Sequence, residues 1–320
     1  MNNKTSIDLS IIVPVYNGEA TINRCLKSLC TKSNIEYEII IVNDNSTDNT
    51  LSIIEKNYSN NANINIINNH QNLGAGLSRN KGLEKAKGKY VGFVDCDDWV
   101  DYNLFVNAIN ILNKTKADIG IFGVMNEYGN FCTSTPRYEY SNEISFPTKS
   151  AIDILSRNIT NSEYISPMIC QKIYKRNFLL DNHIIFNGNR YFEDDIFTYL
   201  SFTFEGIVTL IPKVVYHYSQ SPHSVSHRIS KDYIHSFSLA FKKIKKELID
   251  RNIFDEMKDN YYSYLDKGLM SVLSVIHTEE QNVSIQKKYI SELLISLQDV
   301  ISLDDFINYI DITRLYRIWK

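Results

Sequence analysis

The 320-residue chain lacks several features that mark particular classes of protein. Its five cysteines are odd in number, and none stands in Cys-x-x-Cys spacing or beside a histidine cluster, which favours free thiols over a disulfide framework or a zinc site. It has no apolar run of about 18 residues that could span a membrane, and no recognisable signal peptide. A net charge of −3 gives no electrostatic reason to expect nucleic acid as a partner. We therefore expect a cytoplasmic globular protein, whose 43% hydrophobic content can supply a full core.

The first part of the chain alternates apolar runs with amphipathic segments. Strands are predicted at Leu9–Val15, Tyr37–Val42, Ile64–Ile67 and Tyr90–Val94, and helices over Ile22–Leu29, after Asp48 and over Ala75–Lys87. We expect Ser46 or Thr47 to cap the second helix and Gly88 to follow the end of the third. Strands that alternate with helices of this length predict an α/β fold with a parallel sheet covered on both faces.

The pattern changes after residue 98. The sequence predicts an amphipathic helix over 100–114, a strand over 119–124, a hairpin or mobile loop over 127–147, a helix over 148–157, and two late strands over 207–211 and 214–218 around Pro212. From about Lys231 the chain is predicted to be helical, including 233–249 and 284–300. We therefore divide the chain near residue 228, into an α/β domain (1–228) and a helical C-terminal region (229–320).

The most informative residues are Asp95-Cys96-Asp97-Asp98, which directly follow the apolar run Tyr90–Val94. Carboxylates at the carboxyl end of such a strand project into the crevice where open α/β sheets bind ligands. Asp95 and Asp97 can share one hard divalent cation, because carboxylate oxygens suit Mg²⁺ or Mn²⁺. The alternative is a polar turn that closes the strand and caps the helix that begins near Val100. We expect Asp98 either to cap this helix or to orient the other aspartates.

Four motifs occur in a consistent order along the first half. They are Ile12-Val13-Pro14-Val15-Tyr16-Asn17, Val42-Asn43-Asp44-Asn45-Ser46-Thr47-Asp48, Asn72-Leu73-Gly74 with Ser78-Arg79-Asn80, and Phe93-Val94-Asp95-Cys96-Asp97-Asp98. Together they resemble the nucleotide-sugar-binding half of the inverting glycosyltransferase family 2, which has the GT-A fold. The resemblance covers residues 8–115 strongly and extends more weakly through 216–218 and 224–226. One departure is Asn43, where the family more often carries a second aspartate.

The resemblance implies a nucleotide-sugar donor, most simply a UDP-sugar, and Mn²⁺ or Mg²⁺ as cofactor. In it Asp44 accepts a hydrogen bond from the base, Tyr16 stacks on the base, and Arg79 pairs with a diphosphate oxygen or a neighbouring aspartate. Asp97 is the first choice for the metal, and Asp95 binds the metal or the ribose. The other nucleotide-binding residues expected from it are Pro14, Asn17, Glu19 and Cys96. The structural alternatives are turn bonding for Asp44 and a solvated helix position for Arg79.

A single-displacement transfer also needs a base that takes the proton from the acceptor hydroxyl. Glu193-Asp194-Asp195, followed by an apolar helix, resembles the acidic pair in the acceptor half of family 2. That match makes Asp194 the base and places Glu193 and Asp195 in the acceptor site, although Asp195 could be the base if the register differs. Adjacent carboxylates raise one another's pKa, which suits a base that works near neutrality. The alternative is an acidic helix N-terminus without a catalytic role.

The residues and the resemblance together predict a metal-dependent inverting glycosyltransferase. The resemblance implies that it extends a bacterial surface glycan, with a glycan or lipid-linked glycan as acceptor. A sugar-phosphate nucleotidyltransferase is less consistent, because Tyr16-Asn17-Gly18-Glu19 is not a basic, glycine-rich loop. From another class, the chain could be a non-catalytic glycan-binding or scaffold subunit.

Some residues leave alternatives open. One of His217, His223 and His227 could complete the metal site, although each is more simply a surface or loop residue. The basic stretch Lys242–Lys246 is most simply a solvated helix face, and its alternative is peripheral attraction to anionic lipid. A homo-oligomer is also open.

Overall fold

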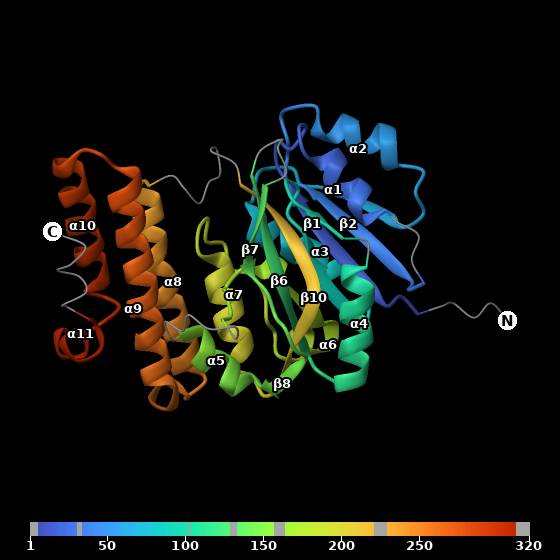
Figure 1. Ribbon diagram of the computed structural model, residues 1–320. Helices are drawn as coiled ribbons and strands as arrows, with labels where there is room; N and C mark the ends of the chain where they lie inside the picture. The colour runs from blue at the N-terminus through green and yellow to red at the C-terminus, as the bar shows by residue number, and fades with distance from the viewer. Residues whose placement is uncertain are drawn as a thin grey trace.

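The computed structural model describes residues 6–30, 34–101, 103–128, 133–156, 164–220 and 229–311. A ten-stranded sheet runs through the molecule, with strand order β3-β2-β1-β4-β9-β6-β10-β5, while β7 pairs with β6 and β8 pairs with β10 (Figure 1). The strands are β1 (Leu9–Val15), β2 (Tyr37–Asn43), β3 (Ile64–Asn68), β4 (Tyr90–Phe93), β5 (Trp99–Val100), β6 (Ile119–Tyr128), β7 (Thr133–Tyr138), β8 (Ile144–Pro147), β9 (Lys172–Lys175) and β10 (Ile207–Gln220).

The first four strands form the parallel part of the sheet. β1 lies between β2 and β4, with Leu9 opposite Tyr37 on one side and Tyr90 on the other. Every residue of β1 is buried, as expected for a strand covered on both faces. The connecting helices are α1 (Ile22–Leu29), α2 (Thr50–Tyr58) and α3 (Ala75–Lys85). This confirms the predicted α/β fold and its parallel strands, whose carboxyl ends meet at one edge.

The second part of the sheet is mixed. β9 is antiparallel to both β4 and β6, whereas β6 and β10 are parallel. The antiparallel pairing of β7 with β6 confirms the hairpin predicted over 127–147. The two predicted late strands are one strand, β10, whose register with β6 shifts between Ile211 and Val215 and whose Lys213 has φ 62°. A bulge at this point accommodates Pro212, which has no N–H to donate to the ladder.

The remaining helices follow the sheet and then form a C-terminal group. They are α4 (Leu104–Thr115), α5 (Thr148–Ser156), α6 (Arg176–Asp181), α7 (Glu193–Phe202), α8 (Lys231–Asp250), α9 (Phe254–Glu279), α10 (Val283–Leu297) and α11 (Leu303–Tyr309). The predicted helical C-terminal region is therefore confirmed. Among the described residues, no helix combines the length and the hydropathy needed to cross a bilayer.

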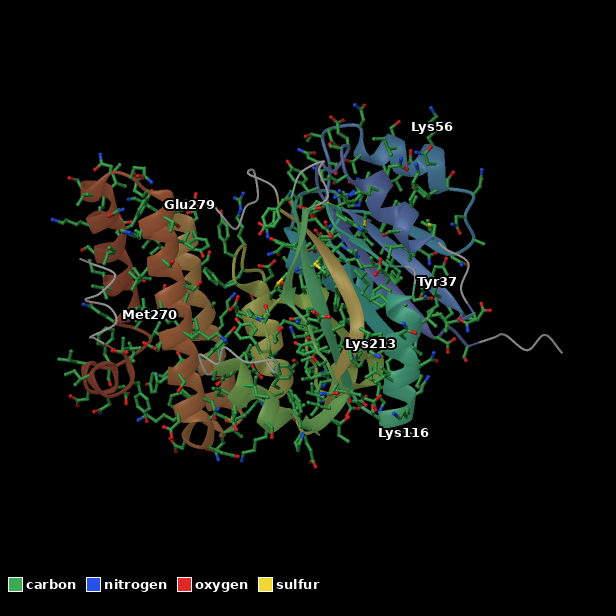
Figure 2. All side chains as sticks on the ribbon, in the orientation of Figure 1. Tyr37, Lys56, Lys116, Lys213, Met270 and Glu279 are labelled. Carbon is green, nitrogen blue, oxygen red and sulfur yellow. The ribbon has the colours of Figure 1, made fainter. Side chains whose placement is uncertain are left out.

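Two apolar clusters cover the two faces of the sheet. One cluster, which includes Ile11, Leu26 and Leu112, packs beneath α1 and α4. The other runs without a break from Ile12 in β1 to Ile310 beyond α11. Helices α5 and α7 lie between the sheet and the C-terminal helices, where α5 contacts α9 and α7 contacts α8 (Figures 1 and 2, with Met270 and Glu279 marking α9). The division near residue 228, which lies outside the described residues, stays a prediction.

Two local expectations at helix ends are wrong. α2 begins at Thr50, after Asn49, because the side chains of Ser46 and Thr47 bind Asn17 instead of capping the helix. α3 ends at Lys85, and Gly88 does not terminate it. Gly88 is required for a different reason, since a Cβ there would come within 2.4 Å of the Ser10 nitrogen of β1.

The helix predicted from Val100 begins later than expected. Trp99 and Val100 form β5, in which Val100 lies opposite Tyr216 of β10. α4 therefore starts at Leu104. As a result the chain after Asp98 crosses to β10 before it turns into a helix, which ties the acidic turn to the far part of the sheet.

Candidate active site

The loops after β1 and β2 bind each other at the carboxyl edge of the sheet. The Asn17 amide N–H donates to Ser46 Oγ at 3.0 Å, and the Thr47 N–H donates to Asn17 Oδ1 at 2.8 Å. The Glu19 carboxylate accepts hydrogen bonds from the backbone and side-chain nitrogens of Asn49, at 3.0 and 2.9 Å. In this structure Asn17 and Glu19 thus connect the two loops that border the predicted nucleotide site.

Asp44 is buried at the end of β2 and connects the second loop to the third. Its carboxylate accepts hydrogen bonds from Asn69 Nδ2 and the Leu73 N–H on Oδ1, and from the Gly74 N–H on Oδ2, at 2.8 to 2.9 Å. Gly74 has φ 85°, a conformation that side chains disfavour. Turn bonding, the structural alternative for Asp44, is therefore only partly correct. The Asp44 carboxylate binds backbone N–H groups of the Asn72-Leu73-Gly74 motif, and not those of its own turn. Tyr16 remains 48% exposed, and Pro14 lies opposite Val42 in the sheet.

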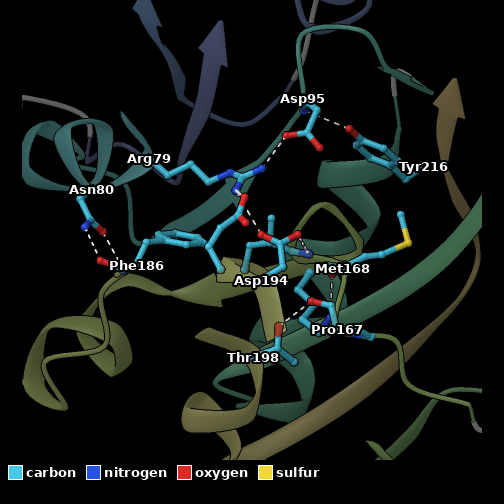
Figure 3. Close-up of polar contacts among 12 residues, drawn as sticks. Arg79, Asn80, Asp95, Pro167, Met168, Phe186, Asp194, Thr198 and Tyr216 are labelled. Carbon is cyan, nitrogen blue, oxygen red and sulfur yellow. Dashed lines mark hydrogen bonds and ion pairs between the residues drawn. The ribbon is translucent and has the colours of Figure 1, made fainter. Parts of the chain in front are cut away.

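Arg79 joins the donor and acceptor halves of the predicted site (Figure 3). It lies on α3 with its side chain only 4% exposed, and its guanidinium forms ion pairs with Asp95 at 2.8 Å, Asp194 at 3.1 Å and Glu193 at 3.3 Å. This excludes the solvated position and matches the expected pairing with a neighbouring aspartate. The predicted metal-binding turn, through Asp95, and the predicted base Asp194 thus contact the same guanidinium group.

One cation facing three carboxylates leaves an acidic cluster with elevated pKa values. Burial and the neighbouring Asp194 together raise the pKa of Glu193 to about 8, against the opposing effect of Arg79. Burial also raises the pKa of Asp194, and here again Arg79 opposes the shift. Such shifts are typical of groups that exchange protons near neutral pH.

Asp195 faces a different part of the molecule from Asp194. Its carboxylate accepts a 2.6 Å hydrogen bond from Tyr264 Oη, which belongs to helix α9 of the C-terminal region. Burial raises the pKa of Asp195 to about 6, although the Tyr264 hydrogen bond lowers it. The first turn of α7 therefore directs Glu193 and Asp194 to Arg79 and Asp195 toward the C-terminal helices.

Asp98 does not cap a helix, so that expectation is wrong. Its buried carboxylate accepts hydrogen bonds from Tyr216 Oη at 2.6 Å and from the Ser219 N–H at 2.8 Å, both in β10. The Tyr216 oxygen also accepts the Asp95 N–H at 3.0 Å. Burial raises the pKa of Asp98, and its neighbours Asp97 and Asp95 raise it further. Asp98 therefore orients the acidic turn, the second role that the sequence allowed.

The side chains of the acidic turn fit a hard divalent cation. Asp97 forms no ion pair with any described residue, and burial together with Asp95 raises its pKa to about 6, so a cation beside it would stabilise its ionised form. Asp95, Asp98 and Cys170 also have ligand atoms within 4.8 Å of one another. Burial raises the pKa of the Cys170 thiol, which makes it a poor ligand for Mg²⁺ or Mn²⁺ compared with the carboxylates.

Two other predicted participants have different surroundings. His217 places Nδ1 2.7 Å from Glu127 and Nε2 3.2 Å from Asp101, so both ring nitrogens are engaged. His223 and His227 lie outside the described residues. The Cys96 thiol lies near Gly18, where a Cβ would come within 3.3 Å of its sulfur, and burial raises its pKa.

Sequence reasoning missed several residues that support the site. Arg24 of α1 donates to the Asp97 carbonyl and to Ser219 Oγ, and its guanidinium lies 4.3 Å from the Trp99 ring centroid. Lys172 lies fully buried at the start of β9, where it interacts electrostatically with Asp194. A lysine inside the apolar run Met168–Tyr174 was a visible signal for Lys172, whereas nothing local marked Arg24.

A family model described as glycosyl transferase family 2 matches residues 10–198. The match includes every motif at the sheet edge and the acidic turn of α7. This chain belongs to glycosyl transferase family 2. It is accordingly a glycosyltransferase, as the arrangement of the sheet edge and the resemblance of its motifs indicated.

Curated relatives and solved structures agree with this membership. An uncharacterized glycosyltransferase of Escherichia coli, YibD, is 28% identical over 92% of this chain and 86% of its own length. The poly(ribitol-phosphate) beta-N-acetylglucosaminyltransferase TarS of Staphylococcus aureus is 27% identical over 78% of this chain but only 42% of its own length. A crystal structure of TarS 1–349 superposes with a TM-score of 0.68 at 23% identity, covering 92% of this chain and 81% of that one, and so supports the GT-A-like fold.

Proposed function

We propose that this protein is a metal-dependent inverting glycosyltransferase that transfers a sugar from a UDP-sugar to a hydroxyl group of a glycan acceptor. The observation that carries the proposal is the set of ion pairs that Arg79 forms with Asp95, Glu193 and Asp194. A single buried guanidinium holds Asp95, in the predicted donor and metal turn, and Asp194, the predicted base, at 2.8 and 3.1 Å. A single displacement requires the base and the leaving diphosphate to lie on either side of one reacting carbon, and this arrangement brings their predicted sites together.

Asp194 is the proposed base that takes the proton from the acceptor hydroxyl. Both of its oxygens are oriented, Oδ1 by Arg79 and Oδ2 by the Ile169 N–H at 3.1 Å. Its raised pKa suits proton transfer near neutral pH. Glu193 is the proposed acceptor-site residue. For Asp195, predicted as a second acceptor-site residue, the hydrogen bond from Tyr264 supports the proposal that it stabilises the α7 turn.

The donor occupies the carboxyl edge in this proposal. Tyr16 is exposed for stacking on the base, and Asp44 fixes the third loop while keeping carboxylate lone pairs for the base N–H. Pro14, Asn17, Glu19 and Cys96 shape the loops around it. Asp97 and Asp95 would hold Mn²⁺ or Mg²⁺. When bound there, the ion supplies positive charge that stabilises the departing diphosphate.

The similar proteins support a proposal for the sugar donor and for the product. TarS is described as a beta-N-acetylglucosaminyltransferase and has been solved with UDP-GlcNAc. We therefore propose a UDP-hexose or UDP-N-acetylhexosamine as donor and a surface polysaccharide, such as a capsule, lipopolysaccharide or teichoic acid, as the product. The acceptor is then a glycan or a lipid-linked glycan, met at the inner face of the cell membrane.

Membrane attachment and homo-oligomerisation stay predictions. In the basic stretch of α8, Lys242 pairs with Asp299, Lys246 with Asp250, and Lys245 donates to the Val300 carbonyl. These contacts favour the simpler assignment of a solvated helix face over attraction to anionic lipid.

Nucleotide release from UDP-, GDP- and CMP-sugars, measured with Mn²⁺, Mg²⁺ or EDTA, tests the proposal. We expect metal-dependent release from a UDP-sugar. We also expect Asp97→Asn to lose it, and Asp194→Asn to lower transfer to an acceptor by about 10²–10⁴-fold while UDP binding persists. Asp181→Asn, an exposed carboxylate on α6, serves as the matched control with wild-type activity. Absence of nucleotide-sugar binding in the wild type would overturn the proposed donor, metal dependence and reaction.

A further inference from the structure

Lys172 is a buried cation that the proposed reaction does not use. It begins β9, has no exposed surface, and lies on the same face of the strand as Tyr174, toward α7. Its Nζ donates to the Ser166 carbonyl at 2.6 Å and to the Met168 carbonyl at 2.7 Å. A lysine this deeply buried is costly unless its ammonium group is well paired, so a specific role for it deserves a test.

The residues bound by Lys172 form one short segment beside the proposed base. The carbonyl between the two, that of Pro167, accepts a 2.8 Å hydrogen bond from Thr198 Oγ1 of α7. Three consecutive carbonyls are therefore held, two by Lys172 of β9 and one by Thr198 of α7. Figure 3 shows the contact between Thr198 and Pro167. The Met168 N–H also donates to Ser166 Oγ at 3.2 Å. The segment is thus fixed from both sides in a single orientation.

The last residue of this segment, Ile169, provides the backbone N–H that binds the Asp194 carboxylate. The Ile169 N–H donates to Asp194 Oδ2 at 3.1 Å, and Thr198 lies one turn after Asp194 on the same helix. In its protonated form Lys172 also lowers the pKa of Asp194 against the effect of burial. Burial lowers the pKa of Lys172 itself to about 7, and Asp194 opposes that shift.

We propose that Lys172 is a positioning residue, which fixes the Ser166–Ile169 segment so that the Ile169 N–H orients Asp194. The inference rests on the proposed function, in which Asp194 is the base. Lys172 acts through the segment and does not touch donor or acceptor. Removing its ammonium group frees two carbonyls, loosens the Ile169 N–H and misaligns the carboxylate by enough to slow the reaction, since small errors of alignment cost large factors in rate.

The test compares Lys172→Met with Lys175→Met, a matched control on the same strand. Lys175 pairs with Asp118 at 3.1 Å, away from the site. Lys172→Met is expected to speed amide exchange of residues 166–169 by about tenfold and to lower kcat by about 10–100-fold, with donor KM within about twofold. Lys175→Met is expected to change neither. Hydrogen exchange by mass spectrometry and steady-state kinetics give the two readouts.

Two further variants guard against a failure to fold. Thr198→Val removes only the bond to the Pro167 carbonyl and should give the same pattern with a smaller amplitude. In Lys172→Ala, propylammonium is expected to restore part of kcat, whereas propanol, which lacks the charge, should not. Unchanged exchange and kcat within about twofold in Lys172→Met and Thr198→Val would overturn the inference.

The two proposals fail in different ways. A wild-type protein that transfers no sugar from any donor would overturn the proposed function. The exchange of residues 166–169 in the Lys172 and Thr198 variants would still decide whether Lys172 fixes the segment.

Discussion

The two sides of the candidate site are built in different ways. The donor side consists of loops after neighbouring strands, which bind one another through hydrogen bonds over moderate sequence separations, such as that between Asn17 and Ser46, 29 positions apart. The acceptor side gathers buried charges from distant parts of the chain, since Arg79 and Asp194 are 115 positions apart. The donor side therefore depends on contacts between neighbouring loops. The acceptor side depends on contacts between helices and turns that lie far apart in the sequence.

This difference has consequences for stability. A typical hydrogen bond contributes about 0.5–1.5 kcal/mol net, whereas removal of one partner from a buried ion pair costs about 3–5 kcal/mol. Substitutions on the acceptor side should therefore disturb folding and activity together. Substitutions on the donor side should mainly affect nucleotide binding.

Arg79→Met should have the largest effect. It leaves the half-buried carboxylates of Asp95, Glu193 and Asp194 without their cation, so we expect a loss of about 3–5 kcal/mol in the free energy of unfolding at pH 8, measured in urea. Arg79 lowers the pKa of Asp194, so its removal raises that pKa and moves the acid limb of the rate profile to higher pH. The stability penalty should shrink toward pH 5, where the carboxylates can take up protons.

The control for Arg79→Met is Lys81→Met on the same helix, whose side chain is 49% exposed and pairs with Glu84 at 3.8 Å. It should be close to the wild type, because exposed pairs contribute little. Equal stability of Arg79→Met and Lys81→Met would contradict the view that the acceptor side depends on buried charge.

Asp44→Asn should be next, and it tests the donor side. The carboxylate accepts three N–H groups, and an amide would point its own NH₂ at one of them or more. An unsatisfied donor of this kind costs about 1–3 kcal/mol. We expect weaker UDP binding by about tenfold in calorimetry. Loss of kcat without loss of affinity would show instead that this loop serves the chemical step.

Asp195→Asn should have a smaller effect of opposite sign. The folded pKa of about 6 exceeds the ordinary value of 3.8, so the wild type loses stability as pH rises from about 4 to about 6. The amide still accepts from Tyr264 but carries no buried charge. We expect Asp195→Asn to be more stable by about 1–2 kcal/mol at pH 8 and to lack that pH dependence.

The control for Asp195→Asn is Asp195→Ala, which also loses the Tyr264 hydrogen bond and should gain less. Urea unfolding at pH 4, 6 and 8 gives the comparison. A stability curve for Asp195→Asn parallel to the wild-type curve at all three values would rule out a raised folded pKa.

The same contrast explains what could be predicted from sequence. On the donor side, apolar runs in the sequence predicted β1 to β4. Asp44 and Asp97 lie in the turns after β2 and β4, so local patterns were enough to predict where they lie. The partners of the acceptor side come from α3, the turn at Ile169 and α9, and no local pattern relates these segments. The sequence left two roles open for Asp98 for a similar reason, because the partners that decide its role, Tyr216 and Ser219, lie far along the chain in β10.

Glu19→Ala should have the smallest effect. Glu19 is exposed, and its carboxylate supplies acceptors to the nitrogens of Asn49 at the start of α2. Loss of such a capping contact costs about 1 kcal/mol or less, and water can replace it at an exposed site. We expect donor KM to rise about threefold with kcat unchanged, and Glu19→Gln, which keeps an acceptor, to lie between. A fall in kcat comparable to that of Asp194→Asn would erase the distinction between the two sides, because an exposed loop contact would then control the chemical step as strongly as the buried charges do.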